Sequence, residues 1–574
     1  MWRIRFLKFL LIIAVIIVGI RLFIIQIIEH GQWVEKAVAE HTLLETIMAE
    51  RGQIYMMDVE EGPTAVAMNQ KVYAVIIDPM VTDKEQIRQA LEKHAKAEMT
   101  TDIDRIYKQE GLRYYIVARN VGKAVADEIA KEGILGVRFQ QRTRRVYPEG
   151  EMASRLLGFV NEDGEGQYGV EGALNQRLKG EDGMLKTVAD VNKVALSIGN
   201  DNIRKPAVNG ENIVLTIDRG LERGVEDILA KVREKKVGAQ VATIVMDPRN
   251  GQVLAMANLP NYNPAEYGRV KDATEYINYT TEIPYEPASI CKTFTFATAI
   301  DKGVMKPETK YLNKGFLIVD GKKIENAYPG KIGEIDMQTA LNYSLNTGSI
   351  QALKWLGGNE TEITQEGRGE LYNYFYNRFG FGVYTGIELY EALGVIPKPD
   401  EGYARDLTYA TMTFGQGLNM TMIQAVAAFA SIVNGGEYYR PTIVAGTMKG
   451  QEFRVAENNP VVRRVIEPET SEIMRRMLYG TRLRRRELGI DRRGYYVGGK
   501  TGTAQVVREG VYTEAKGETI ASYIGFGGRE LPEYVIMVKI WEEGKHLEGE
   551  RDALPIFDEI SNFVQNYFKI KPKV

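Results

Sequence analysis

The 574-residue chain has very little cysteine and histidine, and this scarcity excludes several kinds of chemistry. Its one cysteine, Cys291, cannot form an intrachain disulfide. The four histidines are scattered along the chain, which gives no support for a cysteine–histidine zinc site. Only His546 lies in the second half, so a serine–histidine–aspartate triad there would depend on that residue alone. We expect neither a metal nor a cofactor.

The chain also lacks a strong net charge. Its 73 basic and 76 acidic residues leave a formal charge of −3, so no overall field would attract nucleic acid. Hydrophobic residues make up 44% and charged residues 26%, both ordinary for a folded protein, so extensive disorder is not expected. The length predicts two or more domains.

One long hydrophobic run stands near the N-terminus, and we find no second one. The twenty residues Phe9–Ile28 reach about 30 Å as a helix, the thickness of a hydrocarbon core. Three basic residues precede the run, which predicts a cytoplasmic tail over 1–8 and an extracytoplasmic remainder. A cleaved signal peptide is the alternative, but the run is long and lacks a small-residue cleavage site. The prediction is therefore a single-pass cell-membrane protein.

The pattern after the membrane segment predicts a strand-rich domain over 29–215 and a second domain over 216–574. A helical stalk is expected over 29–48. Strands at both ends of the second domain, with helices between them, predict an antiparallel sheet whose halves are distant in sequence. The predicted fold class is multidomain α+β. The strands and the closing helix expected there lie at 241–246, 496–505, 522–526, 534–540 and 555–567.

A serine and a lysine three residues apart, Ser289 and Lys292, form the first candidate catalytic motif. They precede an expected helix over 293–300, where free backbone N–H groups stabilise negative charge. A lysine one turn from the serine, buried so that its pKa falls, can act as the base for the hydroxyl. By itself the motif is weak, because an N-cap serine beside a solvated lysine has the same pattern.

Ser344 and Asn346 form the second motif, in a helical run expected from residue 337. A second hydroxyl can relay protons between the nucleophile, the lysine and a leaving amine. The amide of Asn346 can donate to a substrate carbonyl. The same stretch is also typical of a loop between helices, so this motif alone is weaker than the first.

The third motif lies within 498–505. Lys500 with the hydroxyls of Thr501 and Thr503 is suited to holding a carboxylate, and Gly502 lets another backbone approach closely. The stretch 494–501 also matches the phosphate-binding pattern G-x-x-x-x-G-K-[ST]. We reject that alternative, because a P-loop opens a helix whereas strand-like residues follow here. An extracytoplasmic domain also meets no nucleotide pool.

Two other features have an ordinary explanation beside a functional one. Cys291 could be a redox switch, but burial as a small packing residue is the favoured interpretation. The basic run 482–486, with two further arginines at 492 and 493, could attract an anionic lipid-linked substrate. A solvated loop or helix face is the favoured interpretation of that run.

Together and in this order, the three motifs resemble the signature of the penicillin-recognising serine acyltransferases. The resemblance extends to the class B penicillin-binding proteins over nearly the whole chain. That family usually has glycine where Ala288 stands. The asparagine at 346 and the YEP sequence before Ala288 are more similar to the septal, or division, branch than to the elongation branch. The segments that carry the resemblance are 51–54, 145–159, 169–172, 215–222, 285–289, 379–382, 385–389, 414–424, 434–436 and 500–505.

The resemblance implies a non-catalytic pedestal of the dimerisation type over 29–215 and a penicillin-binding transpeptidase domain of the serine β-lactamase-like fold over 216–574. It also implies D-alanyl-D-alanine transpeptidation on peptidoglycan stem peptides. In that reaction Ser289 attacks the carbonyl of the penultimate D-alanine and Lys292 takes its proton. Backbone N–H groups of Ser289 and Thr503 would form the oxyanion hole.

The same resemblance assigns the remaining steps. Ser344 and Lys500 would help to protonate the departing D-alanine, and the two threonines of the third motif would hold its carboxylate. An amine of a neighbouring strand then resolves the acyl-enzyme, whereas β-lactams would acylate Ser289 and remain. The implied catalytic residues are Ser289, Lys292, Ser344, Asn346 and Lys500, and the implied substrate-binding residues are Thr501, Gly502 and Thr503.

The implied partners are stem peptides, the lipid-linked precursor, β-lactams, a separate integral-membrane glycan polymerase and other wall-synthesis or division proteins. Four alternatives stay open: an elongation-type enzyme, a carboxypeptidase or β-lactamase, a β-lactam receptor, and a non-catalytic scaffold. The large first domain argues against a simple β-lactamase. A tail of about eight residues leaves no room for a cytoplasmic signalling domain, and intact motifs argue against a scaffold.

Overall fold

The computed structural model describes residues 2–33, 42–109, 111–188, 203–328, 330–401, 405–483, 494–508, 511–512 and 517–572. The chain forms two compact units, and each is described by itself. The first comprises Met1–Gly52 and Lys179–Glu211, and the second comprises Gln53–Leu178 and Asn212–Val574.

The first unit contains the N-terminal helix and a small sheet. Helix α1 (Trp2–Phe23) continues as η1 (Ile24–Ile28). Within the described part of the chain, Trp2–Ile28 is the one helix long and apolar enough to cross a membrane. The sheet is antiparallel, in the order β1 (Thr42–Ile47), β8 (Gly183–Val188) and β9 (Ile203–Lys205).

The helix predicted over 29–48 is wrong at its C-terminal end. Residues Thr42–Ile47 form β1, which pairs with β8 from Thr42 opposite Val188 to Ile47 opposite Gly183. The backbone groups of 42–47 are therefore satisfied by a segment more than 130 residues away. Such a partner is invisible to local periodicity. Most of the rest of that predicted helix lies outside the described residues.

A mixed sheet occupies the first part of the second unit. Strand β10 pairs with β2 on one side and with β19 on the other, so segments from both predicted domains share one sheet. Helices α3 and α5 belong to a separate apolar core over β3 and β4. The strand order is β20 (Glu452–Val455), β19 (Val444–Lys449), β10 (Asn212–Asp218), β2 (Ile54–Met57), β3 (Thr64–Ile77) and β4 (Tyr115–Val121), with β5 (Val137–Val146) also on β3. The other elements of this part are α3 (Lys84–His94), η2 (Lys96–Glu98), α4 (Ile103–Ile106), α5 (Lys123–Lys131), α6 (Ser154–Leu157), β6 (Phe159–Val160), β7 (Gly166–Gln167), α7 (Gly169–Ala173) and α8 (Asn175–Lys179).

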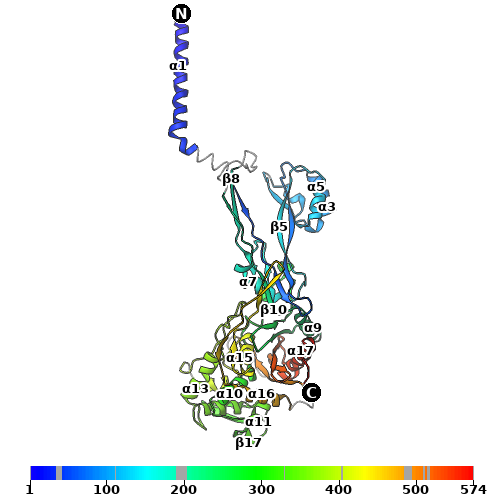
Figure 1. Cartoon of the computed structure of the whole chain (residues 1–574), viewed down its shortest axis with the longest axis vertical. Helices are drawn as coiled ribbons and strands as arrows, with labels where there is room; N and C mark the ends of the chain where they lie inside the picture. Colours follow the sequence, from blue (N-terminus) through cyan, green and yellow to red (C-terminus); the bar gives the residue numbers. More distant parts are fainter. Residues whose placement is uncertain are drawn as a thin grey trace. The chain divides into compact units, whose positions relative to one another are not determined.

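A central antiparallel sheet organises the rest of the second unit, which confirms the predicted sheet built from distant segments. Its strands alternate between two apolar cores, as the period of two in a strand requires. Helices α9 (Arg219–Lys235) and α17 (Leu554–Tyr567) contact each other and cover one face, and α15 (Met422–Val433) packs on the other (Figure 1). The strand order is β12 (Val253–Ala255), β11 (Gln240–Met246), β26 (Pro532–Trp541), β25 (Thr519–Gly528) and β22 (Tyr496–Gln505), with β13 (Asn258–Leu259) also on β11.

Most of the remaining helices form an apolar lobe beside this sheet. Helix α10 (Cys291–Asp301) is buried on nearly every side, which fits the absence of a charged outer face along it. The other helices are η3 (Pro264–Arg269), η4 (Ala273–Tyr276), η5 (Ala288–Ile290), α11 (Met337–Asn342), α12 (Asn346–Leu356), α13 (Gln365–Tyr372), η6 (Asn373–Arg378), α14 (Arg405–Met412), α16 (Pro468–Leu483) and η8 (Gly549–Ala553). Small two-stranded sheets pair β14 (Lys310–Asn313) with β17 (Gly333–Asp336), β15 (Phe316–Val319) with β16 (Lys322–Glu325), β18 (Glu437–Tyr439) with β21 (Val461–Arg464), and β23 (Val507–Arg508) with β24 (Val511–Tyr512).

The structure bears on the interpretations of Cys291 and of the basic run 482–486. Cys291 is buried, and burial raises the pKa of its thiol, which supports the packing interpretation. Arg482, at the start of the basic run, is 7% exposed and forms an ion pair with Asp558 of α17. The solvated interpretation is therefore wrong for Arg482, because a buried acid partner was not visible in the sequence. The other arginines of the run lie outside the described residues.

Candidate active site

The first two motifs meet at the side-chain nitrogen of Lys292. Its Nζ lies 2.9 Å from Ser289 Oγ and 3.2 Å from Ser344 Oγ. It also donates to the carbonyl oxygen of Ser344 at 2.5 Å. Ser289 and Lys292 are brought together by the turn from η5 into α10, and Ser344 comes from the connection between α11 and α12. Two hydroxyls and an amine therefore share one hydrogen-bonded cluster.

The environment of Lys292 favours its neutral form. The side chain is 1% exposed. Burial, and then the charge of nearby Lys500, hold the pKa of Lys292 well below its usual value. A lysine that loses its proton more readily than a solvated one can accept the proton of a neighbouring hydroxyl.

The nucleophile turn contains a residue in an unusual conformation. Ala288 has φ 49°, in the left-handed region that favours glycine. Its N–H donates to the carbonyl of Gly415, and a Cβ on Gly415 would lie 2.1 Å from the Ala288 carbonyl oxygen. The 415 loop and the nucleophile turn are therefore in direct backbone contact. The family that the chain resembles usually has glycine at position 288. The strained turn places Ser289 just before helix α10.

A sharp turn presents Ser344. Helix α11 ends at Asn342, Ser344 has φ 55°, and α12 begins at Asn346. The single helical run expected from residue 337 is therefore wrong at 343–345, and the loop alternative is right. The left-handed conformation lets both the carbonyl and the hydroxyl of Ser344 reach Lys292. The Asn346 amide donates to the carbonyl of Glu325 in β16 at 2.8 Å, on the rim of this cluster.

The third motif lies on β22, which continues as a strand through residue 505 and has no helix after the lysine. The rejection of a P-loop is confirmed. Lys500 is 1% exposed, and its Nζ lies 3.1 Å from the carbonyl oxygen and 3.3 Å from the hydroxyl of Thr501. Thr501 and Thr503 alternate with buried positions and face the less enclosed side of the strand. The Thr503 hydroxyl accepts the N–H of Gly549 at 2.9 Å.

Gly502 joins the third motif to the first. A Cβ there would lie 2.5 Å from Ser522 Oγ and 2.7 Å from the carbonyl oxygen of Pro287. The close approach expected at this glycine is therefore made by the turn that carries Ser289. Any larger residue would push that turn away from β22.

Sequence reasoning assigned no role to several neighbours of this cluster. The Phe414 ring lies 5.8 Å from Lys292 Nζ, and the Gln416 amide donates to Gln505 of β22 at 3.3 Å. The glycines around these residues, Gly415 and Gly417, have positive φ, so their spacing was a usable signal. Gly549 gave no signal in the sequence, because its contact with the third motif depends only on tertiary packing.

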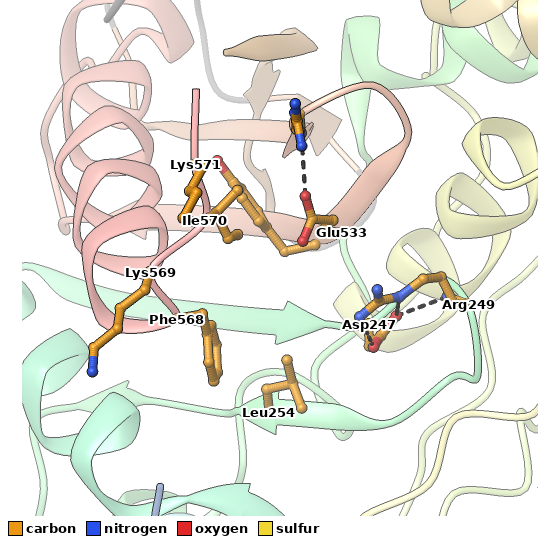
Figure 2. Close-up of a pocket in the computed structure, with 10 residues that line it drawn as sticks. Asp247, Arg249, Leu254, Glu533, Phe568, Lys569, Ile570 and Lys571 are labelled. Atoms are coloured by element: carbon orange, nitrogen blue, oxygen red, sulfur yellow. Dashed lines mark hydrogen bonds and ion pairs between the residues drawn. The ribbon is translucent and has the colours of Figure 1, made fainter. Parts of the chain in front are cut away.

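A separate pocket of about 510 Å³ lies away from the three motifs. Figure 2 shows Asp247 and Arg249 beside Leu254 on one side, and Phe568 to Lys571 after α17 on another. Asp247 forms a bidentate pair with Arg249. None of the eight predicted site residues lines this pocket. In the described part of the chain, no group of three or more histidine, cysteine, aspartate or glutamate side chains is arranged to hold a metal ion.

Comparisons with known proteins give two family matches that together cover most of the chain. The family model of the penicillin binding protein transpeptidase domain matches residues 241–562, and that of the penicillin-binding protein dimerisation domain matches residues 46–215. Stage V sporulation protein D of Bacillus subtilis is 29% identical over 537 residues, which cover 91% of this chain and 79% of that protein. Peptidoglycan D,D-transpeptidase FtsI of Escherichia coli is 27% identical over 583 residues, which cover 100% and 92%.

Solved structures share the fold. Penicillin binding protein 2X from Streptococcus thermophilus has a TM-score of 0.72 at 22% identity, covering 92% of this chain and 81% of that one. Penicillin binding protein 3 from Mycobacterium tuberculosis, complexed with aztreonam, has a TM-score of 0.68 at 21% identity, covering 92% and 98%. Because the transpeptidase model spans more than half of the chain and the dimerisation model precedes it, the chain belongs to the penicillin-binding protein transpeptidase family, as a class B member.

Proposed function

We propose that this protein is a peptidoglycan D,D-transpeptidase that crosslinks stem peptides through an acyl-enzyme on Ser289. The observation that carries the proposal is the 2.9 Å contact between Ser289 Oγ and the Nζ of a buried lysine whose pKa is lowered. This arrangement supplies an activated hydroxyl without a histidine. Several relatives of this chain are named as peptidoglycan D,D-transpeptidases.

Acylation begins when neutral Lys292 takes the proton of Ser289 as Oγ attacks the carbonyl of the penultimate D-alanine. Backbone N–H groups of Ser289 and Thr503 stabilise the oxyanion, and such a donor contributes about 3–4 kcal/mol in a well-characterised hydrolase. The C–N bond then breaks, and the departing D-alanine receives the proton held by Lys292. Ser344 Oγ, 3.2 Å from Nζ, provides the relay.

The third motif binds the terminal carboxylate of the donor peptide. Lys500 supplies positive charge, and the hydroxyls of Thr501 and Thr503 supply donors. Because the Thr503 hydroxyl accepts the Gly549 N–H, its own proton can point to the carboxylate. Asn346, on the opposite rim, donates to the peptide backbone. An amine of a neighbouring stem peptide then attacks the ester, and its proton returns through Lys292 to Ser289 Oγ.

β-Lactams acylate Ser289 by the same first step and remain bound as the ester. The solved relative complexed with aztreonam supports this part of the proposal. If neither an amine nor water can reach the ester, the enzyme stays acylated and inactive.

The rest of the chain holds this site outside the membrane, near the cell wall. We propose that Phe9–Ile28 anchors the protein once in the membrane, with 1–8 in the cytoplasm and the catalytic domain outside. We assign 29–215 as a pedestal and 216–574 as the catalytic domain. The partners are a separate integral-membrane glycan polymerase and other wall-synthesis proteins. A role in septal synthesis is supported by Asn346 and by the YEP sequence before Ala288, which are more similar to the division branch of the family.

Fluorescent penicillin labelling of the purified protein tests the proposal. Wild type should be labelled covalently, and Ser289→Ala should not. Ser431→Ala, which replaces a buried serine of α15 outside the cluster, is the matched control and should be labelled like wild type. Labelling of Ser289→Ala would contradict the assignment of the nucleophile.

A second assay separates crosslinking from hydrolysis. The enzyme is given a stem peptide ending in D-alanyl-D-alanine together with an excess of a free D-amino acid. A transpeptidase exchanges the terminal D-alanine for the added amine, whereas a carboxypeptidase releases only the shortened peptide. Mass spectrometry of the products distinguishes the two.

A further inference from the structure

A lysine outside the three motifs is buried in the sheet beside the nucleophile turn. Lys539 lies on β26, and its side chain is 8% exposed. Burial lowers the pKa of Lys539 to about 8. A buried ammonium is costly unless partners replace the lost water, so its partners indicate what it does for the fold.

Lys539 shares one face of the central sheet with the glycine of the third motif. It pairs with Ser522 of β25, which in turn pairs with Gly502 of β22. Directly opposed residues of antiparallel strands project to the same face. Gly502 is where the carbonyl of Pro287 rests on β22. Lys539 therefore lies two strands away, in the same row, on the face that supports the nucleophile turn.

The ammonium of Lys539 contacts both ends of the segment that leads into this turn. Its Nζ donates to the carbonyl oxygen of Tyr279 at 3.2 Å and lies 4.9 Å from the centre of the Tyr285 ring. These are the distances of a hydrogen bond and a cation–π contact. Tyr285 precedes Ser289 by four residues and pairs with Met420 through its backbone. Lys539 thus connects the central sheet to the last stretch of chain before the nucleophile.

The side chains around Lys539 are polar, and not all of them make good hydrogen bonds. The buried hydroxyl of Tyr285 interacts with that of Ser522, but neither makes a hydrogen bond of good geometry within the described part of the chain. Poorly paired buried polar groups destabilise a fold, and each one calls for an explanation. An apolar side chain at 539 would pack the same space without these costs. The arrangement is therefore explained better by positioning than by stability.

We propose that Lys539 is a positioning residue for Ser289, because it holds the segment Tyr279–Tyr285 against the sheet and thereby keeps the nucleophile turn on β22. This inference rests on the proposed acylation of Ser289. Misplacement of reacting groups by about 1 Å can slow a reaction about a hundredfold. Loss of the contact should therefore slow acylation more than it weakens the noncovalent binding of penicillin.

The test replaces Lys539 with methionine in the full-length protein, which keeps an unbranched side chain and removes the charge. The matched control is Lys354→Met on α12, another lysine that is 8% exposed and whose pKa is lowered by burial. Stopped-flow labelling with fluorescent penicillin gives the acylation rate constant and the noncovalent Kd separately. Thermal unfolding gives Tm, and hydrogen–deuterium exchange reports on peptides covering 279–290.

For Lys539→Met we expect an acylation rate constant about 10- to 100-fold below wild type, with Kd changed by no more than about twofold. Exchange over 279–290 should be faster, and Tm should be no lower than that of the control. An unchanged rate or unchanged exchange overturns the proposal. A slower rate that recovers fully on cooling below a lowered Tm also overturns it, because the role would then be structural.

The same experiment separates this inference from the proposed function. If wild type is not labelled at all, acylation at Ser289 is contradicted. The exchange over 279–290 then still decides whether Lys539 holds this segment. Normal labelling of wild type, with unchanged exchange in Lys539→Met, removes the positioning role and leaves the proposed function intact.

Discussion

Two regions of the protein bury ionisable side chains, and burial has opposite consequences in them. At the candidate active site, Lys292 is enclosed with two hydroxyls and a carbonyl. In α9, Glu222 and Glu226 are buried one helical turn apart. Glu222 accepts the N–H of Met256, while Glu226 accepts a backbone N–H and an asparagine amide. Burial lowers the pKa of the lysine and raises the pKa of both carboxyls.

The comparison shows that one physical cause, the cost of burying charge, serves two purposes. A neutral amine is a base, whereas a neutral carboxyl is a partner in a hydrogen-bonded layer. Their contributions to stability also run in opposite directions with pH. The lowered lysine pKa makes the folded state bind fewer protons than the unfolded one, so stability rises as pH increases toward 10.5. The raised carboxyl pKa makes the folded state bind more, so stability falls as pH rises above about 4.5.

The largest expected effect comes from removing the buried base. Lys292→Met should lower the acylation rate by about 10²- to 10⁴-fold, because the serine proton then has no acceptor. Tm should stay the same or rise, since methionine avoids the desolvation of an ammonium. Penicillin labelling kinetics and thermal unfolding measure the two quantities. Lys354→Met is the control, and a variant that loses Tm and acylation in parallel would contradict the assigned role.

The pH dependence of acylation is the next largest effect. Below the lowered pKa of Lys292 the amine is protonated and cannot take the serine proton, so the rate should fall by up to about tenfold per pH unit. The rate should already be high at pH values where an ordinary lysine is fully charged. Labelling kinetics between pH 5 and pH 9 measure the profile, with intrinsic penicillin reactivity as the reference. A rate that rises only near the usual lysine pKa would contradict the effect of burial.

Much of the framework was predictable from local pattern. Strand β22 and helix α17 lie where the sequence pattern predicted a strand and a helix. Helix α17 has an apolar period that its packing face follows. Strand β1 was mistaken for a helix because its partner, β8, is far away in sequence.

The candidate site was predictable in its members but less so in its geometry. Spacing placed Ser289 and Lys292 on neighbouring turns, and the structure puts them in contact. The left-handed turn at Ser344 was not predictable, because serine has no intrinsic preference for it and its partner Lys292 lies 52 residues away in sequence. The polar layer at Lys539 was missed because its partners, in the segment 279–285 and on β25, are distant from it in sequence. The chemical roles of the site residues stay predictions.

An effect of intermediate size on the free energy of unfolding is expected at the buried carboxyls of α9. Glu222→Gln removes the group that must ionise, so the variant should be more stable than wild type at pH 8 by about 1–3 kcal/mol. The difference should shrink toward pH 5, where the glutamate is protonated in the folded state. Denaturant unfolding at both pH values measures it. Glu234→Gln, at an exposed position of the same helix, is the control and should show no such pH dependence. Equal stabilisation at both pH values would contradict the raised pKa.

The smallest effect is expected at the strained turn around Ala288. This turn leads into Lys292, and Lys539 is proposed to position it. Ala288→Gly should raise the free energy of unfolding by about 0.5–1 kcal/mol, because relief of a left-handed alanine exceeds the entropy cost of glycine. Ala130→Gly, at an exposed position in α5, should instead lower it by about 1 kcal/mol. Denaturant unfolding compares the two variants directly. If both lose stability equally, the left-handed conformation of Ala288 costs nothing, and the turn is held without strain.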